Sequence, residues 1–176
     1  MKDRTKQKEK THQKLLSITK EIYLDQGYIN TSTKVISKKA NVSQGTIFLH
    51  FETKQKLLAT IIVDELDRLF YKLQETSPSI DELFLSIVDN ERLLSRVMKD
   101  YPCMPERFQT SFDQVRMGYK DQLFDLLKPK SKLSILDLFA LIEMVLALIF
   151  EDLFYAKTDI MVNKIKKYQK IIKKYS

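Results

Sequence analysis

The sequence predicts an all-α protein, and three observations lead to this prediction. Glycine occurs 3 times and proline 4 times in 176 residues, so helix-breaking residues are scarce. Apolar residues recur at helical spacing, with no run of alternating apolar and polar residues that would indicate a strand. Hydrophobic residues make up 44% of the chain, which is enough to form a core.

The first third of the chain predicts three helices. Residues 1–10 form a polar, lysine-rich arm, and a helix follows over residues 11–26, ended by Gly27. Residues 33–40 predict a short helix capped by Thr31 or Ser32. The pair Asn41-Val42 predicts a tight turn, because asparagine tolerates the left-handed conformation. A third helix begins at Ser43 and continues to about residue 50.

The remaining residues predict a bundle of longer helices. Thr53 caps a helix that reaches about residue 74, and Thr76-Ser77-Pro78 breaks it. Ser79 and Glu82 have the spacing of a capping box, which opens a helix that we expect to continue through Val97. After a loop at 101–105, we expect helices over residues 106–127, 133–156 and 159–175.

The positive charge is concentrated at the N-terminal end. Residues 1–58 hold 12 lysines and arginines against 5 acids, whereas residues 59–176 hold 18 of each. This asymmetry predicts that the first third of the chain meets a polyanion, and both nucleic acid and an anionic membrane fit the charge.

Cysteine usage and hydropathy predict a cytoplasmic protein. Cys103 is the only cysteine, so no intrachain disulfide is possible. The N-terminus is charged and lacks the apolar stretch of a signal peptide. The most apolar segment, residues 133–154, carries four acidic residues, and we expect no membrane span.

Residues 33–50 have the properties of a helix-turn-helix, in which the second helix lies in the DNA major groove. Apolar residues fix the angle between the two helices: Val35, Ile36, Ala40, Val42 and Ile47. Small polar residues open the second helix, which lets it approach base edges: Ser43, Gln44, Gly45 and Thr46. Gly45 costs helix stability of about 1 kcal/mol, so close approach to DNA is a better reason for its presence than structure.

The spacing of these residues resembles that of the TetR (tetracycline repressor) family over residues 11–60. The resemblance is carried by Tyr23, Gly27-Tyr28, Thr31-Ser32-Thr33, Ala40-Asn41-Val42-Ser43, Gly45-Thr46-Ile47-Phe48, His50-Phe51, Lys54 and Leu57-Leu58. Two residues depart from the family pattern: Phe48 stands where the family usually has a tyrosine that contacts phosphate, and Asn41 where it usually has a glycine.

The resemblance implies a role for each residue of the motif. Gln44 and Thr46 would contact base edges, since glutamine matches the edge of adenine. The phosphate contacts would come from Thr33, Ser43, His50 and Lys54, and Phe48 would pack on a sugar or a thymine methyl group. Lys6, Lys8 and Lys10 of the arm would add salt-dependent affinity. The alternatives are that Gln44 and the arm are only solvated and that His50 only packs or caps.

The resemblance also implies a DNA-binding domain at 1–55 and a body at 56–176 that binds a small effector and forms a homodimer. Such a protein would hold a palindromic operator and release it on binding the effector. The expected dimer contacts are apolar residues of the last two helices: Phe139, Leu146, Ile149, Phe150, Ile165, Tyr168 and Ile172. The alternative is that these residues fill the core of the monomer.

An effector site is expected among inward-facing residues of the body, with an apolar or cationic ligand. The candidates are Phe70, Phe84, Phe108, Phe112, Tyr119, Phe124, Glu143 and Met144. The alternative is that the aromatic residues are ordinary core and that Glu143 is exposed or paired with a lysine or arginine. No cofactor and no metal site is expected.

Three other classes of protein compete with this interpretation. An enzyme is disfavoured, because the chain has two histidines and one cysteine and lacks a catalytic or phosphate-binding motif. A protein that organises DNA or assists division would use the same motif without an effector. A membrane-surface protein would use residues 159–175, whose lysine face opposes Ile165, Tyr168 and Ile172.

Overall fold

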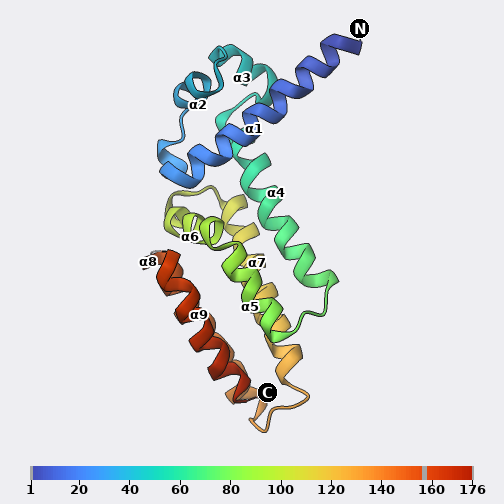
Figure 1. The fold of residues 1–176 in the computed structure, drawn as a ribbon, viewed down its shortest axis with the longest axis vertical. Helices are drawn as coiled ribbons and strands as arrows, with labels where there is room; N and C mark the ends of the chain where they lie inside the picture. Colours follow the sequence, from blue (N-terminus) through green and yellow to red (C-terminus); the bar gives the residue numbers. More distant parts are fainter. Residues whose placement is uncertain (1, 156–157, 176) are drawn as a thin grey trace.

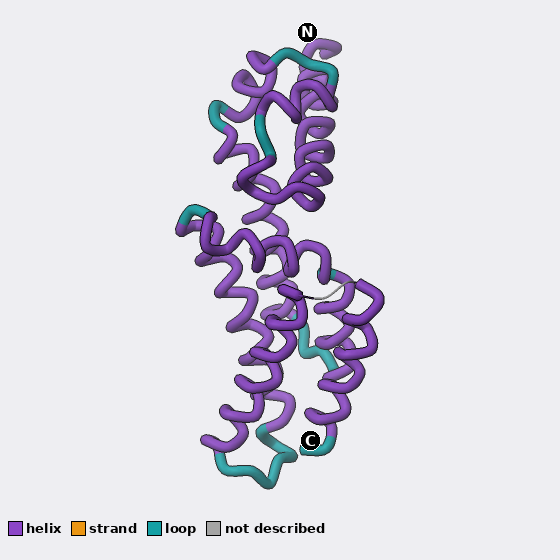
Figure 2. Tube along the Cα trace, turned by 90° about the vertical axis from the view of Figure 1, so that its left-hand side faces the viewer, coloured by secondary structure: helices purple, strands orange, loops and turns teal. Residues whose placement is uncertain are grey.

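The computed structural model describes residues 2–155 and 158–175, and within these ranges it contains nine α-helices and one 3₁₀ turn but no strand (Figure 2). A small N-terminal domain stands on an elongated helical body, with the two chain ends at opposite ends of the molecule (Figure 1). The helices are α1 (Lys2–Asn30), α2 (Thr33–Ala40), α3 (Gln44–Phe51), α4 (Lys54–Glu75), α5 (Ile80–Asp89), α6 (Glu91–Asp100), α7 (Glu106–Leu127), α8 (Ile135–Tyr155) and α9 (Thr158–Lys173), and the 3₁₀ turn is η1 (Tyr101–Cys103).

Side-chain caps place the helix starts where the sequence predicts them. The hydroxyls of Ser32, Ser43 and Thr53 each accept a hydrogen bond from a backbone N–H in the first turn of α2, α3 and α4. Ser79 and Glu82 form the predicted capping box at the start of α5. Asn41 has φ 52° and ψ 52°, so the left-handed turn between α2 and α3 is confirmed.

The prediction of a non-helical arm over residues 1–10 is wrong, because α1 begins at Lys2. At the other end, Gly27 has φ 81° and ψ 178°, which interrupts α1 at the residue predicted to end it. One further helical turn follows the interruption. The hydroxyl of Thr31 closes this corner by donating to the Gly27 carbonyl over 2.7 Å.

The prediction of one helix from residue 80 through Val97 is also wrong. Asn90 has φ −105° and ψ 9°, and it separates α5 from α6. The side-chain amide and the backbone N–H of Asn90 both donate to the Ser86 carbonyl, which closes the end of α5. Neither glycine nor proline marks this break.

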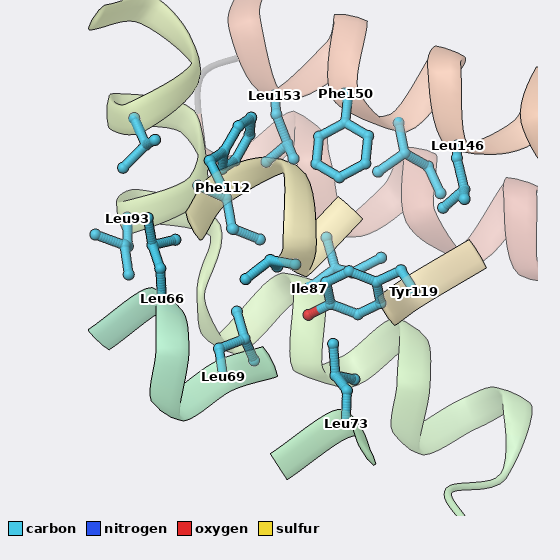
Figure 3. Packing of buried hydrophobic residues seen from close by; sticks show 14 of the residues in the cluster. Leu66, Leu69, Leu73, Ile87, Leu93, Phe112, Tyr119, Leu146, Phe150 and Leu153 are labelled. Atoms are coloured by element: carbon cyan, nitrogen blue, oxygen red, sulfur yellow. The ribbon is translucent and has the colours of Figure 1, made fainter. Parts of the chain in front are cut away.

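Two hydrophobic cores share α4. The smaller core joins α1, α2 and α3 to the first turns of α4 through Leu57 and Ile61. The larger core contains the rest of α4 together with the body helices, and Figure 3 shows Leu66, Leu69 and Leu73 among its members. The domain boundary predicted at residue 55 falls inside α4. Leu57 and Ile61, which follow that boundary, still belong to the core of the N-terminal domain.

The apolar helix α8 turns one face into the protomer and one face outward. Five of the seven expected dimer residues are buried inside the protomer: Leu146, Ile149, Phe150, Ile165 and Ile172. The alternative of a monomer core therefore describes these five, whereas Phe139 and Tyr168 are half-buried. The outward face carries other apolar side chains: Leu136, Ala140, Met144, Ala147 and Leu148.

The outward face of α8 is thus not buried within the protomer. Leu136 is 81% exposed and Met144 is 51% exposed. Ile165 and Ile172 of α9 are buried in the protomer, so these two side chains are not free to contact a membrane surface. Among the helices of residues 2–155 and 158–175, none combines the length and apolar character needed to cross a membrane.

Replacing Gly27 with alanine is expected to destabilise the protein by about 1–3 kcal/mol. The positive φ at Gly27 disfavours a side chain, and an added Cβ would lie 2.8 Å from an oxygen of Asp100. Urea denaturation followed by circular dichroism would measure the loss. Gly45→Ala is the matched control, since its Cβ would meet nothing closer than 3.6 Å. Equal stability of wild type and Gly27→Ala would contradict this account of the corner.

Candidate nucleic-acid interface

A buried apolar wedge fixes α3 against α2 and α1. Ile36, Ala40 and Ile47 have no exposed surface, and Val35 and Val42 are half-buried beside them. The backbone N–H of Val42 donates to the Ser37 carbonyl over 3.1 Å, which closes the turn. The angle between the two helices is therefore set by packing and by backbone hydrogen bonds, as a helix-turn-helix requires.

The outward face of α3 is formed by residues at i, i+1, i+4 and i+5. Gln44, Gly45, Phe48 and Leu49 are exposed, with 45% of Phe48 and 75% of Leu49 accessible. Nothing stands within 3.6 Å of a Cβ built on Gly45, so this face is open to close approach. Apolar side chains on such a face suit thymine methyl groups, and polar ones suit base edges.

Leu49 was missed by the sequence prediction. Its position four residues after Gly45 places it on the outward face, and this spacing is the signal that could have identified it. The run Ile47-Phe48-Leu49 hides the signal, since three consecutive large apolar residues do not show which of them is buried.

A hydrogen bond from α2 orients Gln44. The hydroxyl of Thr33 donates to Gln44 Oε1 over 3.1 Å. The amide oxygen has two lone pairs and the amide nitrogen has two hydrogens, so both remain available to an adenine edge. Thr33 thus lies where it orients Gln44, and its expected contact with phosphate stays a prediction.

Ser43 and Thr46 are tied to each other at the start of α3. Ser43 Oγ accepts from the Thr46 backbone N–H over 3.1 Å and lies 3.0 Å from Thr46 Oγ1. Ser43 therefore serves as the helix cap. The predicted contacts of these two hydroxyls with phosphate and base stay predictions.

His50 lies against α1 at the far end of α3. Its ring centroid is 5.6 Å from that of His12, which itself stacks on Phe51 at 4.6 Å. Burial, and then the neighbouring His12 and Lys8, hold the pKa of His50 below its usual value. The packing alternative for His50 fits this placement, and a phosphate contact stays a prediction.

Lys54 turns toward the corner of α1. Its Nζ donates to the Tyr28 carbonyl over 2.9 Å and lies 5.0 Å from the centre of the Tyr28 ring. Burial lowers the pKa of this ammonium group. Lys54 thus joins α4 to α1, a role that the sequence did not predict. Its expected contact with phosphate stays a prediction.

The expected effector residues are mostly packed in the core. Phe84, Phe108, Phe112 and Tyr119 are at most 2% exposed, and Phe70 and Phe124 are partly buried against the same core. The Tyr119 hydroxyl is hydrogen-bonded with Ser86 over 2.9 Å. Figure 3 shows Phe112 and Tyr119 among their apolar neighbours.

Two expected effector residues do not face inward. Glu143 is exposed and forms an ion pair with Lys120, which is the alternative that the sequence left open. Met144 lies on the outward face of α8. The expected inward orientation is therefore wrong for Met144, because the inner face of α8 is formed by other apolar side chains such as Ile142 and Val145.

Two of the concave surfaces of the body lie beside the expected effector residues and α4. A cleft of about 310 Å³ separates α4 from α5, and its walls include Leu69, Leu73, Leu83, Leu85 and Ser86. A groove of about 380 Å³ between α7 and α8 contains Arg116, Lys120 and Glu143. Within residues 2–155 and 158–175, no group of three or more histidine, cysteine or acidic side chains is placed to hold a metal ion.

Comparison with known proteins identifies the N-terminal domain. Residues 15–61 match the family described as "Bacterial regulatory proteins, tetR family". The HTH-type transcriptional regulator UidR of Escherichia coli (strain K12) is 31% identical over 65 residues, which are 37% of this chain and 33% of that relative. The match thus spans about a third of the length of this curated relative.

Solved structures match nearly the whole chain. A TetR transcriptional regulator from Legionella pneumophila superposes with a TM-score of 0.69 at 18% identity, covering 92% of this chain and 94% of that one. A second match is Thermus thermophilus FadR, a TetR-family repressor in complex with lauroyl-CoA, with a TM-score of 0.52 at 17% identity and 92% coverage of both chains. At these identities the likeness shows the fold.

Gln44→Ala is expected to weaken binding to a preferred DNA sequence by about 5- to 150-fold, the equivalent of about 1–3 kcal/mol for a lost base contact. Binding to random duplex DNA should stay within about twofold, because the lysines that attract phosphate are unchanged. Fluorescence anisotropy on both duplexes would measure the ratio. Gln114→Ala, an exposed glutamine of α7, is the matched control. A proportionate loss on both duplexes would exclude base recognition by Gln44.

Proposed function

We propose that this chain, which belongs to the tetR family of bacterial regulatory proteins, is a dimeric repressor that a small effector releases from a palindromic operator. The observation that carries the proposal is the outward face of α3. It presents an oriented glutamine, an open glycine and two exposed apolar side chains on a helix held by a rigid wedge. These are the groups that distinguish base pairs in the major groove.

The charge of the N-terminal domain supports DNA as the partner. Lys34 and Lys38 of α2 are exposed, and Lys6, Lys8 and Lys10 extend along the exposed start of α1. The helical form of this segment gives these lysines a fixed spacing in place of a loose arm. Neutralising phosphates with such residues supplies affinity that falls as salt rises.

The outward face of α8 supports a homodimer. Leu136, Ala140, Met144, Ala147 and Leu148 form one exposed apolar stripe along a helix of 21 residues. A large apolar patch on a soluble protein is typical of a binding interface. A two-fold dimer would also present two α3 helices, as a palindromic operator with half-sites about 34 Å apart requires.

The path of α4 supports control by an effector. Its C-terminal part lines the cleft between α4 and α5, and its first residue lies beside the DNA-binding domain. A ligand that separates α4 from α5 would therefore move the recognition helix. The exposed charges at the cleft are Lys72, Glu82 and Asp89, which favour an apolar or cationic ligand. The FadR complex with lauroyl-CoA supports ligand binding by a body of this shape.

Met144→Lys is expected to convert the dimer to a monomer, because it buries an unpaired charge in the proposed interface. Sedimentation equilibrium at micromolar concentration would measure the dimer dissociation constant, which should rise at least about tenfold. Leu85→Lys is the matched control, since Leu85 is 55% exposed on α5, away from α8. A wild-type monomer, or an intact Met144→Lys dimer, would remove α8 from the interface.

The function itself is tested on the DNA that flanks the protein's own gene. Binding of overlapping fragments would be measured by fluorescence anisotropy at several salt concentrations. The proposal expects one palindromic fragment to bind much more tightly than the rest, with affinity falling steeply as salt rises. Equal binding to every fragment would instead support a protein that organises DNA without an operator.

A further inference from the structure

We infer that Arg96 and Asp100 of α6 fix the orientation of the DNA-binding domain and so set the half-site spacing that the dimer accepts. We call these two side chains, with the backbone of residues 24–28 that they hold, the α6 clasp. The inference deepens the proposed function and depends on it, because spacing has meaning only for a dimer on a two-part operator.

The clasp exists because Gly27 interrupts α1. Where a helix is interrupted, carbonyls before the break and N–H groups after it lose their partners within the helix. Arg96 meets the first need: its Nε donates to the Leu24 carbonyl over 3.0 Å and its Nη2 to the Asp25 carbonyl over 2.9 Å. Asp100 meets the second, since its Oδ2 accepts from the Tyr28 N–H over 2.9 Å.

The fit of the clasp requires a glycine. A Cβ on Gly27 would lie 2.8 Å from Asp100 Oδ1 and 3.2 Å from Arg96 Nη1. The two side chains therefore close over the backbone where α1 carries no side chain. Both are only partly exposed, and an exposed ion pair between Arg92 and Asp25 flanks them.

The clasp adds directional hydrogen bonds to the other attachments of the DNA-binding domain to the body. One attachment is covalent, through α4, whose Lys54 donates to the Tyr28 carbonyl. Another is apolar, because Tyr23 is buried in the larger core and the Tyr28 ring lies edge-on to Phe108. In Figure 1 the end of α1 lies beside α6 and close to the start of α4. Apolar packing is non-directional and does not by itself fix the rotation of the domain about α4. With α6 holding the same corner, this rotation also requires three hydrogen bonds to break.

A fixed rotation has a direct consequence on DNA. One base pair added between two half-sites moves them about 3.4 Å apart along the axis and turns one relative to the other. A dimer with rigidly placed recognition helices must bend or lose contacts to follow this change. A dimer whose domains rotate freely can follow it with little loss.

The test uses duplex DNA selected from a random pool by the wild-type protein. Versions with one central base pair inserted or deleted, and a single half-site, are compared by anisotropy. Wild type should prefer the selected spacing by at least about tenfold, equivalent to about 1.4 kcal/mol. Arg96→Ala and Asp100→Ala should reduce this preference to about twofold or less, with half-site affinity kept within about threefold.

Two conservative variants separate positioning from folding. Asp100→Asn retains an acceptor oxygen for the Tyr28 N–H and should restore the spacing preference. Arg96→Lys keeps the charge but lacks the fork that spans two carbonyls, so it should lose the spacing preference. It also replaces Arg96→Ala in the test if Arg96→Ala does not fold. Lys99→Ala, an exposed neighbour on α6, is the matched control and should behave as wild type.

The possible outcomes are distinguishable. Variants that keep the wild-type spacing preference would overturn the role of the clasp. So would variants that lose half-site and full-site affinity in equal proportion, because that result indicates a structural role alone. A wild-type protein that selects no paired half-sites would overturn the proposed operator binding, and the clasp with it.

Discussion

The structure depends on one continuous helix that two hydrophobic cores share. Leu57 and Ile61 of α4 complete the core of the N-terminal domain, and Leu66, Leu69 and Leu73 belong to the core of the body. Close-packed cores resist gradual deformation, so a displacement of α4 in the body is passed along the helix and not absorbed within it. The positions of α3 and of the body helices are therefore linked through the backbone geometry of α4.

Features with local causes could be predicted from the sequence. Ser32, Ser43, Thr53 and Ser79 cap helices through hydrogen bonds to residues three positions away, so their signals lie within one turn. Asn41 formed its turn for the same local reason. The break at Asn90 escaped prediction because asparagine is compatible with a helix interior, and only the closing bonds to Ser86 reveal the end of α5.

The sequence predicts α3 and several of its outward residues, whereas it predicts only the helices of the body and not their buried faces. An eight-residue helix between two caps allows few registers, so Gln44 and Gly45 could be placed outward. The helix α8 is apolar on nearly all sides, and its periodicity could not show which face meets the protomer core. Most of the residues expected at the dimer interface therefore lie on the face that meets the protomer core. Contacts such as Thr33 with Gln44 and Arg96 with Leu24 join distant positions and leave no sequence signal.

The interrupted helix α1 limits how freely these domains can be recombined. The backbone carbonyls and N–H group that the interruption leaves unpaired bond to Arg96 and Asp100, which lie about 70 residues later in the chain, in α6 of the body. A chimaera that joined this DNA-binding domain to a foreign body would leave those backbone groups unpaired unless the new body offered a matching arginine and aspartate. The helix-turn-helix motif is thus not a self-sufficient unit for domain exchange. The unit that can be transferred is the motif together with one turn of α6.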